Sequence, residues 1–189
     1  KIIYSSRKEL TCKSIYYDVK NLSNIDGALA LLSAKRINKS ARSGSTATCT
    51  LCARKITLEN IGGFNKKLRR YEDLDLAIKA LLCNISLISV DNNLIDQFFR
   101  ITTSKLNSNF YELALIKSYK KFLENHKMYD FSYNYALMKH SFFKFKFFIF
   151  LKYLIYLQFK YPINLLEKYQ GSFHTIVFSI LNKLYSSLK

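Results

Sequence analysis

Apolar positions follow two different periods along residues 1–100. Short alternating or continuous apolar runs predict strands, and they lie at residues 1–5, 13–19, 46–54, 85–90 and 94–99. Apolar residues recurring every three or four positions predict helices, at residues 24–36, 56–61 and 69–82. Because strands alternating with helices are typical of layered α/β folds, we expect the α/β class for this region.

Two of these helices carry further local signals. Gly62 and Gly63 directly follow residues 56–61, and glycine suits the positive φ that ends many helices. In the helix at 69–82, one apolar face is expected to consist of Leu74, Ile78, Leu81 and Leu82.

From residue 101 onward the apolar period is helical. One helix is expected from Phe110 to Phe122, an apolar stretch covers residues 142–159, and a last helix starts at Ser172. The apolar stretch contains three lysines and Gln158, and a lysine near the bilayer centre costs about 2.5–3.5 kcal/mol. We therefore expect it to lie on a membrane without crossing it. Packing of these apolar faces on the chain's own body is an equally weighted alternative.

Composition changes near residue 100. Residues 1–100 hold 17 Lys and Arg and 7 Phe and Tyr, whereas residues 101–189 hold 13 Lys, no Arg and 22 Phe and Tyr. We take this change as the boundary between a globular domain at 1–100 and an α-helical basic aromatic tail at 101–189.

The net charge of +17 favours an anionic partner. An anionic membrane surface fits the tail, since aromatic rings suit the headgroup boundary and lysines reach the phosphates. Nucleic acid is not expected as a partner, because the tail lacks the arginines that usually contact phosphates and guanines and no nucleic-acid-binding signature occurs.

The four cysteines do not form a disulfide scaffold or a metal site by their spacing. Cys49 and Cys52 form a CxxC pair without a second pair, and residues three apart on a strand point to opposite faces. All four, Cys12, Cys49, Cys52 and Cys83, are expected to pack as small apolar residues.

Acidic residues concentrate at the start of the helix at 69–82. Glu72, Asp73 and Asp75 directly follow Arg69 and Arg70. Acids in a first helical turn complement the helix dipole, which is sufficient to explain them structurally. The catalytic alternative is a general base at a helix N-terminus, with the arginines holding a phosphate-bearing substrate.

The segment 43–82 resembles the acceptor-side half of family 2 glycosyltransferases. The resemblance lies in a strand ending at Arg54 and Lys55, a short helix, a GGF turn followed by Asn65, and an ED-x-DL helix start at residues 72–76. It implies a GT-A-type Rossmann-like domain, of which residues 1–100 would be the C-terminal half.

The resemblance also implies roles for individual residues. Asp73 would be the catalytic base of an inverting transfer from a nucleotide-sugar to a hydroxyl of a glycan or lipid-linked acceptor. Glu72 would contact the acceptor or support the base, and Asp75 would cap or brace the helix. Arg69, Arg70, Gln97 and Arg100 would bind acceptor or phosphate. Gln97 and Arg100 fall in QFFR, faintly similar to the QxxRW element of processive members, with Ile101 in place of Trp.

The chain departs from the family pattern in its metal site. Members of the family hold a divalent cation through a DxD motif after a strand, whereas Asp73 and Asp75 lie inside the helix and are not assigned the metal. We expect Mg²⁺ or Mn²⁺ in the complete enzyme, with ligands upstream of Lys1, and no sugar transfer by residues 1–189 alone.

The leading hypothesis is therefore a glycosyltransferase of polysaccharide or glycoconjugate synthesis, peripheral on the cytoplasmic face of a membrane. The alternative is a non-catalytic basic module that binds an anionic membrane surface or nucleic acid.

Overall fold

The computed structural model describes residues 2–9, 24–33, 51–85, 87–97 and 108–168. The chain divides into two compact units, Lys1–Ala136 and Leu137–Lys189. The boundary expected at residue 100 lies outside the described residues.

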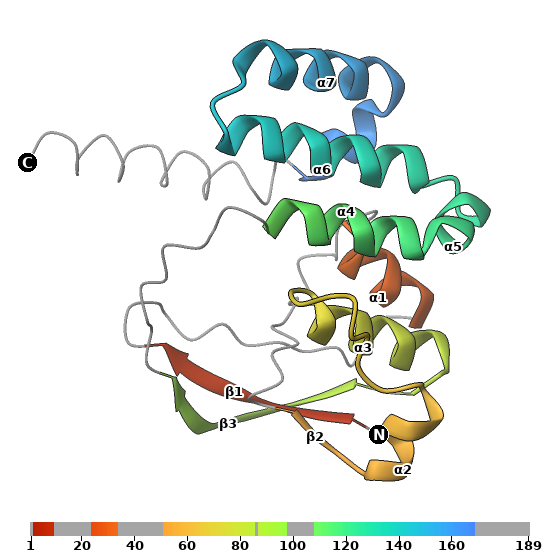
Figure 1. Ribbon diagram of the computed structural model, residues 1–189, viewed down its shortest axis with the longest axis vertical. Helices are drawn as coiled ribbons and strands as arrows, with labels where there is room; N and C mark the ends of the chain where they lie inside the picture. Colours follow the sequence, from red (N-terminus) through yellow and green to blue (C-terminus); the bar gives the residue numbers. More distant parts are fainter. Residues whose placement is uncertain (1, 10–23, 34–50, 86, 98–107, 169–189) are drawn as a thin grey trace, which may run out of the picture. The chain divides into compact units, whose positions relative to one another are not determined.

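The sheet of the first unit has three strands in the order β2-β1-β3 (Figure 1). These strands are β1 (Ile2–Glu9), β2 (Leu51–Ala53) and β3 (Leu87–Gln97). β1 runs antiparallel to β2 and parallel to β3. The pairing of β1 with β3 shifts register on both sides of Ser6, so the longer β3 accommodates extra residues as bulges do.

Helices make up most of the described chain. They are α1 (Asn24–Leu31), α2 (Lys55–Asn60), α3 (Glu72–Leu82), α4 (Ser108–Ser118), α5 (Lys120–Asn125), α6 (Tyr129–Phe143) and α7 (Phe147–Lys160). Residues 162–168 are helical as well. Pro162 stands at the first helical position, where its missing N–H leaves no hydrogen bond unmade.

The expected α/β class, with a GT-A-type Rossmann-like domain, is wrong. The described residues are mostly helical, and their one sheet has three strands of mixed direction. The two apolar runs expected as separate strands at 85–90 and 94–99 overlap a single strand, β3. The run at 13–19 lies outside the described residues. Within the described residues, two short apolar runs therefore predicted two strands where there is one, because a run does not show where a strand continues through polar residues.

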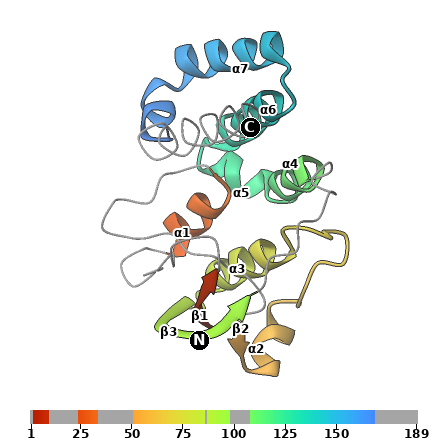
Figure 2. The same ribbon diagram turned by 90° about the vertical axis from the view of Figure 1, so that its left-hand side faces the viewer.

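The core of the first unit is built around α3. Its residues Leu76, Ala77, Ile78 and Ala80 have no measurable exposure. Figures 1 and 2 show α3 over the sheet, with α1 and α4 on its other side. The single apolar face expected for this helix was therefore too narrow, because α3 is covered on more than one side. Leu82, which was assigned to that face, is exposed.

Close approach of α1 to α3 depends on one glycine. A Cβ atom added to Gly27 would lie 3.0 Å from Leu81 Cδ1, tighter than ordinary van der Waals contact. The same core also contains Leu115, Ile116, Leu123 and Ala136 from α4, α5 and α6. The first part of the expected helical tail therefore packs as part of the first unit.

The helical prediction for the tail is confirmed where the structure describes it, with different boundaries. The single helix expected at 110–122 is divided into α4 and α5 around Tyr119. The apolar stretch at 142–159 is interrupted between α6 and α7. The helix expected from Ser172 lies outside the described residues. Within the described part of the chain, no helix is long and apolar enough to cross a membrane.

Candidate functional site

The candidate site is the N-terminal end of α3 together with the turn that precedes it. The turn follows α2, where the backbone N–H groups of Gly62 and Gly63 donate to the carbonyls of Glu59 and Leu58. Gly62 has φ 79° and Gly63 has φ 57°. A Cβ atom at either glycine would meet nothing within 4 Å. The glycines are therefore required by their backbone conformation, as the sequence predicted, and not by lack of space.

The chain between this turn and α3 is held at two points. Asn65 Oδ1 accepts a hydrogen bond of 3.1 Å from the backbone N–H of Lys67, a local turn typical of asparagine. Leu68 then inserts into the core and is almost completely buried. Arg69 remains exposed and Arg70 is half-buried, so the two arginines differ in their surroundings.

α3 begins in an unusual way. Tyr71, the residue before its first turn, has φ 71° and ψ 10°, a left-handed conformation that is uncommon for a residue other than glycine. Its carbonyl accepts the hydrogen bond of Asp75 N–H at 2.9 Å. Left-handed backbone at a large residue costs about 1–3 kcal/mol, so the surrounding structure must impose this sharp entry into α3.

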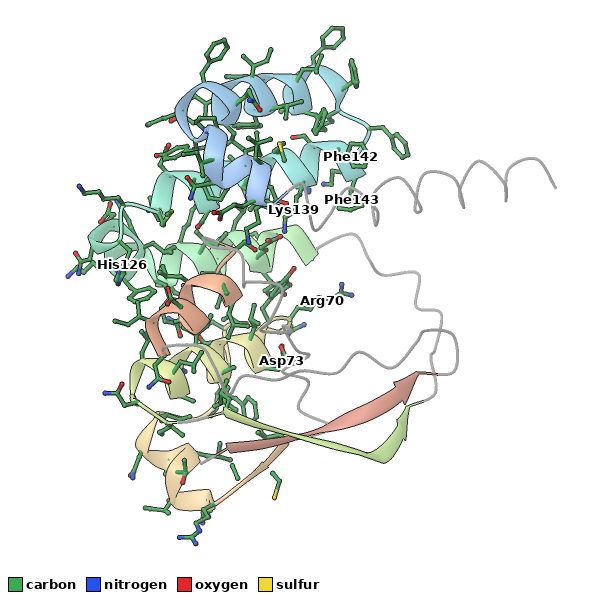
Figure 3. All side chains as sticks on the ribbon, turned by 180° about the vertical axis from the view of Figure 1, so that it is seen from behind. Arg70, Asp73, His126, Lys139, Phe142 and Phe143 are labelled. Carbon is green, nitrogen blue, oxygen red and sulfur yellow. The ribbon has the colours of Figure 1, made fainter. Side chains whose placement is uncertain are left out.

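The two candidate catalytic acids occupy the first two positions of α3. Glu72 and Asp73 are both half-buried. Asp73 Oδ1 accepts a hydrogen bond of 2.7 Å from the backbone N–H of Leu74. Figure 3 shows Arg70 and Asp73 on the same side of the first unit, at the start of α3. The partial positive charge of a helix N-terminus stabilises ionised carboxylates at these positions.

Glu72 differs from Asp73 in its hydrogen bonding. Its Oε2 atom is buried and has no hydrogen-bond partner among the described residues. A buried carboxylate oxygen without a partner is costly. This atom is consistent with the expected role of Glu72 beside the base or toward an acceptor, which stays a prediction.

Asp75 is set apart from the other two acids by its burial. It is only 2% exposed, and Lys79 Nζ lies 2.8 Å from its Oδ2 atom. Tyr119 OH donates a hydrogen bond of 2.8 Å to its Oδ1 atom. Burial, together with the hydrogen bond to the Asp75 carboxylate, raises the pKa of Tyr119 far above its ordinary value, so the phenol stays a donor. Asp75 therefore braces the helix, as expected.

Lys79 extends this bracing to the glycine turn. Its Nζ atom also donates a hydrogen bond of 3.1 Å to the carbonyl of Gly63. A continuous series of contacts thus runs from Tyr119 through Asp75 and Lys79 to Gly63. We call it the Asp75 network. It connects the GGF turn, α3 and the α4–α5 junction, and Asp73 is not one of its members.

Sequence reasoning missed two members of this network. Asp75 and Lys79 are four residues apart, a spacing at which opposite charges meet on a helix, and this signal could have identified Lys79. Tyr119 lies 44 residues from Asp75, and nothing in the local sequence around Tyr119 marks it as a partner.

The remaining candidate residues are placed as follows. Gln97 is the last residue of β3, but its side chain and all of Arg100 lie outside the described residues, so their proximity to Asp73 is untested. The histidines match no motif and are expected to be surface or packing residues. His126, which follows α5, and His140, which lies in α6, are half-buried, and His174 lies outside the described residues.

The divalent cation is expected to have its ligands upstream of Lys1, so that expectation stays a prediction. Among the described residues, no group of three or more His, Cys, Asp and Glu could hold a metal ion, and Lys79 and Tyr119 contact the Asp75 carboxylate. Cys52 and Cys83 are free and exposed, so the expectation that they pack as small apolar residues is wrong. Cys12 and Cys49 lie outside the described residues.

No family model, curated protein or solved structure matches this chain. The similarity to family 2 glycosyltransferases therefore depends entirely on the motif residues and their spacing.

Proposed function

We propose that the protein takes part in inverting sugar transfer from a nucleotide-sugar to a hydroxyl acceptor, with Asp73 as the general base. The observation that supports this proposal is the contrast between Asp73 and Asp75. Asp75 is buried and held by Lys79 and Tyr119, whereas Asp73 is half-buried in the first turn of the same helix. A base must be both fixed in position and accessible to its substrate.

The proposed step uses one displacement. Asp73 takes the proton of the acceptor hydroxyl while that oxygen forms a bond to the anomeric carbon of the donor. The bond from this carbon to the phosphate oxygen breaks, and the nucleotide leaves with the electron pair. The configuration inverts because attack and departure occur on opposite sides. Arg69 and Arg70 supply positive charge for phosphate or acceptor oxygens, and Glu72 supports the base or contacts the acceptor.

The test is Asp73→Asn in the full-length protein. We expect nucleotide release from a panel of nucleotide-sugars to fall about 10²- to 10⁴-fold, since loss of a general base has this effect, with donor binding nearly unchanged. Asp26→Asn is the matched control, because Asp26 is also a first-turn acid of a helix in the same unit. Full activity of Asp73→Asn would disprove the assignment.

We further propose that the protein is peripheral on the inner face of a membrane. Within the described residues 137–168, six lysines accompany a single acid, Glu167. Each lysine near an anionic cytoplasmic leaflet contributes about 1 kcal/mol. This charge is combined with exposed aromatic and aliphatic side chains on α7, which suits the headgroup boundary.

Removing residues 142–188 tests this attachment by cell fractionation. We expect the shortened protein to leave the membrane fraction. High salt should release the intact protein only in part, because salt screens the lysines but not apolar burial. Complete release by salt, or retention of the shortened protein, would contradict the proposal.

A further inference from the structure

The connection between α6 and α7 exposes an unusual concentration of phenylalanine. We define the α6–α7 corner as residues 143–148, with the sequence FKFKFF. Its four aromatic side chains are exposed by 56% (Phe143), 82% (Phe145), 63% (Phe147) and 87% (Phe148). Isolated exposed apolar residues are ordinary, but a contiguous apolar patch indicates a binding surface.

The backbone of the corner is closed by its own hydrogen bonds. Phe145 N–H donates to Phe142 O at 3.1 Å, and Lys146 N–H donates to Ser141 O at 2.9 Å. This pair of bonds forms the motif that satisfies the last carbonyls of a helix. Because these backbone groups are hydrogen-bonded within the chain, they can enter an apolar environment without being left unpaired. Backbone groups in lipid must be paired in this way.

Phe145 occupies the position of this motif that favours glycine. Its φ is 56°, in the left-handed region where a side chain is strained. The same position after α2 is taken by Gly62, with φ 79°. A bulky, 82% exposed phenylalanine at this strained site therefore does not stabilise the turn, and such local strain is often found where a residue has a function.

Two aromatic residues that flank the corner pack against each other. Phe142 and Phe150 are half-buried, and their ring centroids lie 5.4 Å apart. Phe147 contacts Phe150 at a centroid distance of 6.5 Å. Figure 3 shows Phe142 and Phe143 at the end of α6 that leads into α7. The exposed rings are thus carried on a packed aromatic base.

Charge indicates what the corner binds. Lys144 and Lys146 alternate with the phenylalanines and are exposed, and residues 141–166 contain no acid. Apolar rings beside lysines match a surface that is apolar below and anionic above, because lysines can extend to phosphates while the rings enter the acyl region.

We propose that the α6–α7 corner inserts into an anionic lipid surface and is the point at which the protein enters the membrane. This inference rests on the proposed peripheral attachment, and it adds a specific site of insertion and a role for the strained Phe145. It does not depend on sugar transfer.

The chain contains no tryptophan, so a single indole can report insertion. Phe148→Trp in the full chain is mixed with vesicles made of equal parts phosphatidylcholine and phosphatidylglycerol, or of phosphatidylcholine alone. We expect a blue shift of emission and quenching by brominated acyl chains with the anionic vesicles, and a much smaller effect with the neutral ones. Phe110→Trp is the control, since Phe110 is 70% exposed but lies on α4.

Three results of this experiment would overturn the proposal. The first is emission at position 148 that does not respond to anionic vesicles, including emission already blue-shifted because the chain's own residues cover the corner. The second is a blue shift that grows with protein concentration without vesicles, which would identify a second copy as the partner. The third is an equal shift at position 110.

Phe145→Gly separates binding from folding. In a double variant with the reporter Phe148→Trp, this change should lower partitioning into anionic vesicles about tenfold, because one large apolar side chain is lost. The thermal midpoint should stay unchanged or rise, since glycine relieves the left-handed strain. Unchanged partitioning would overturn the role of Phe145, and so would a lowered midpoint. Sugar transfer to a water-soluble acceptor should be unaffected, so failure of the two proposals can be distinguished.

Discussion

At the scale of single residues, the same acidic side chain has different uses at neighbouring positions. Asp75 is enclosed between Lys79 and Tyr119, whereas Asp73, two residues earlier, lies in the first turn at the helix end. One turn of helix therefore supplies both a structural carboxylate and the carboxylate proposed for chemistry. The distinction comes from burial, since the two residues are identical in type and close in sequence.

Removing Asp75 and removing Lys79 are expected to lower the free energy of unfolding by different amounts. Asp75→Asn leaves Lys79, which is 27% exposed and can reach water, so we expect a loss of about 1–3 kcal/mol in unfolding free energy. Lys79→Met leaves a buried carboxylate without its cation, for which about 3–5 kcal/mol is expected. Urea denaturation measures both.

The exposed pair of Lys55 and Glu59 is the control for this comparison. It has the same four-residue spacing, but its side chains are 89% and 55% exposed. Lys55→Met should change stability by about 0.5 kcal/mol or less. If Lys79→Met were as mild as Lys55→Met, the Asp75 network would not hold the turn and α3 together.

Tyr119 predicts a dependence of stability on alkaline pH. Its pKa is raised by burial and by Asp75 above the ordinary value of 10.0. Because the pKa is raised in the native state, the contribution of Tyr119 to the free energy of unfolding is fully present below about pH 10. It declines above that pH, where only the unfolded chain loses the proton. Tyr119→Phe should flatten this decline between pH 9 and pH 11 in denaturation experiments, relative to the parent protein. An equally steep decline in the variant would contradict the assignment.

At the scale of elements, helix ends follow one backbone pattern with different residues in the left-handed position. After α2 the residue is Gly62, after α3 it is Asn84, after α5 it is Lys127 and after α6 it is Phe145. Each is followed by the hydrogen bond that spans the helix end. Glycine and asparagine suit this conformation locally, whereas lysine and phenylalanine are strained in it.

Gly62→Ala tests the GGF turn at this scale. With φ 79° and no neighbouring atom within 4 Å, a methyl group would be strained only through the backbone. We expect a loss of about 1–2 kcal/mol, measured by thermal unfolding. Asn60→Ala, at an exposed helical position of α2, should be neutral or slightly stabilising. No difference between the two variants would show that the turn is not constrained.

At the scale of the whole molecule, the two units should be separable. The core cluster around α3 draws its buried residues from positions 28–136, all within the first unit. Deleting residues 144–189 should therefore preserve the far-ultraviolet circular dichroism and the cooperative unfolding of the first unit, while vesicle binding is lost. Loss of cooperative unfolding on deletion would show that the second unit completes the core.

Several local features could be predicted from sequence because they depend on neighbouring residues. A first strand, expected at 1–5 and found at Ile2–Glu9, the short helix α2, the two positive-φ glycines, and a helix expected at 69–82 and found at Glu72–Leu82 follow from apolar period and turn chemistry. The bracing role of Asp75 was also anticipated. These signals extend over a few residues, and the conformations that they specify need few distant partners.

Tertiary structure decided the rest. Only long-range packing merged two apolar runs into the single strand β3, brought Leu115, Leu123 and Ala136 into the core with α3, and placed Tyr119 against Asp75. The expected fold class was wrong for this reason. A sequence pattern indicates which residues are apolar, but not which segments cover them. The same limit separates Asp73 from Asp75, because identical side chains acquire different surroundings only when helices distant in sequence pack together.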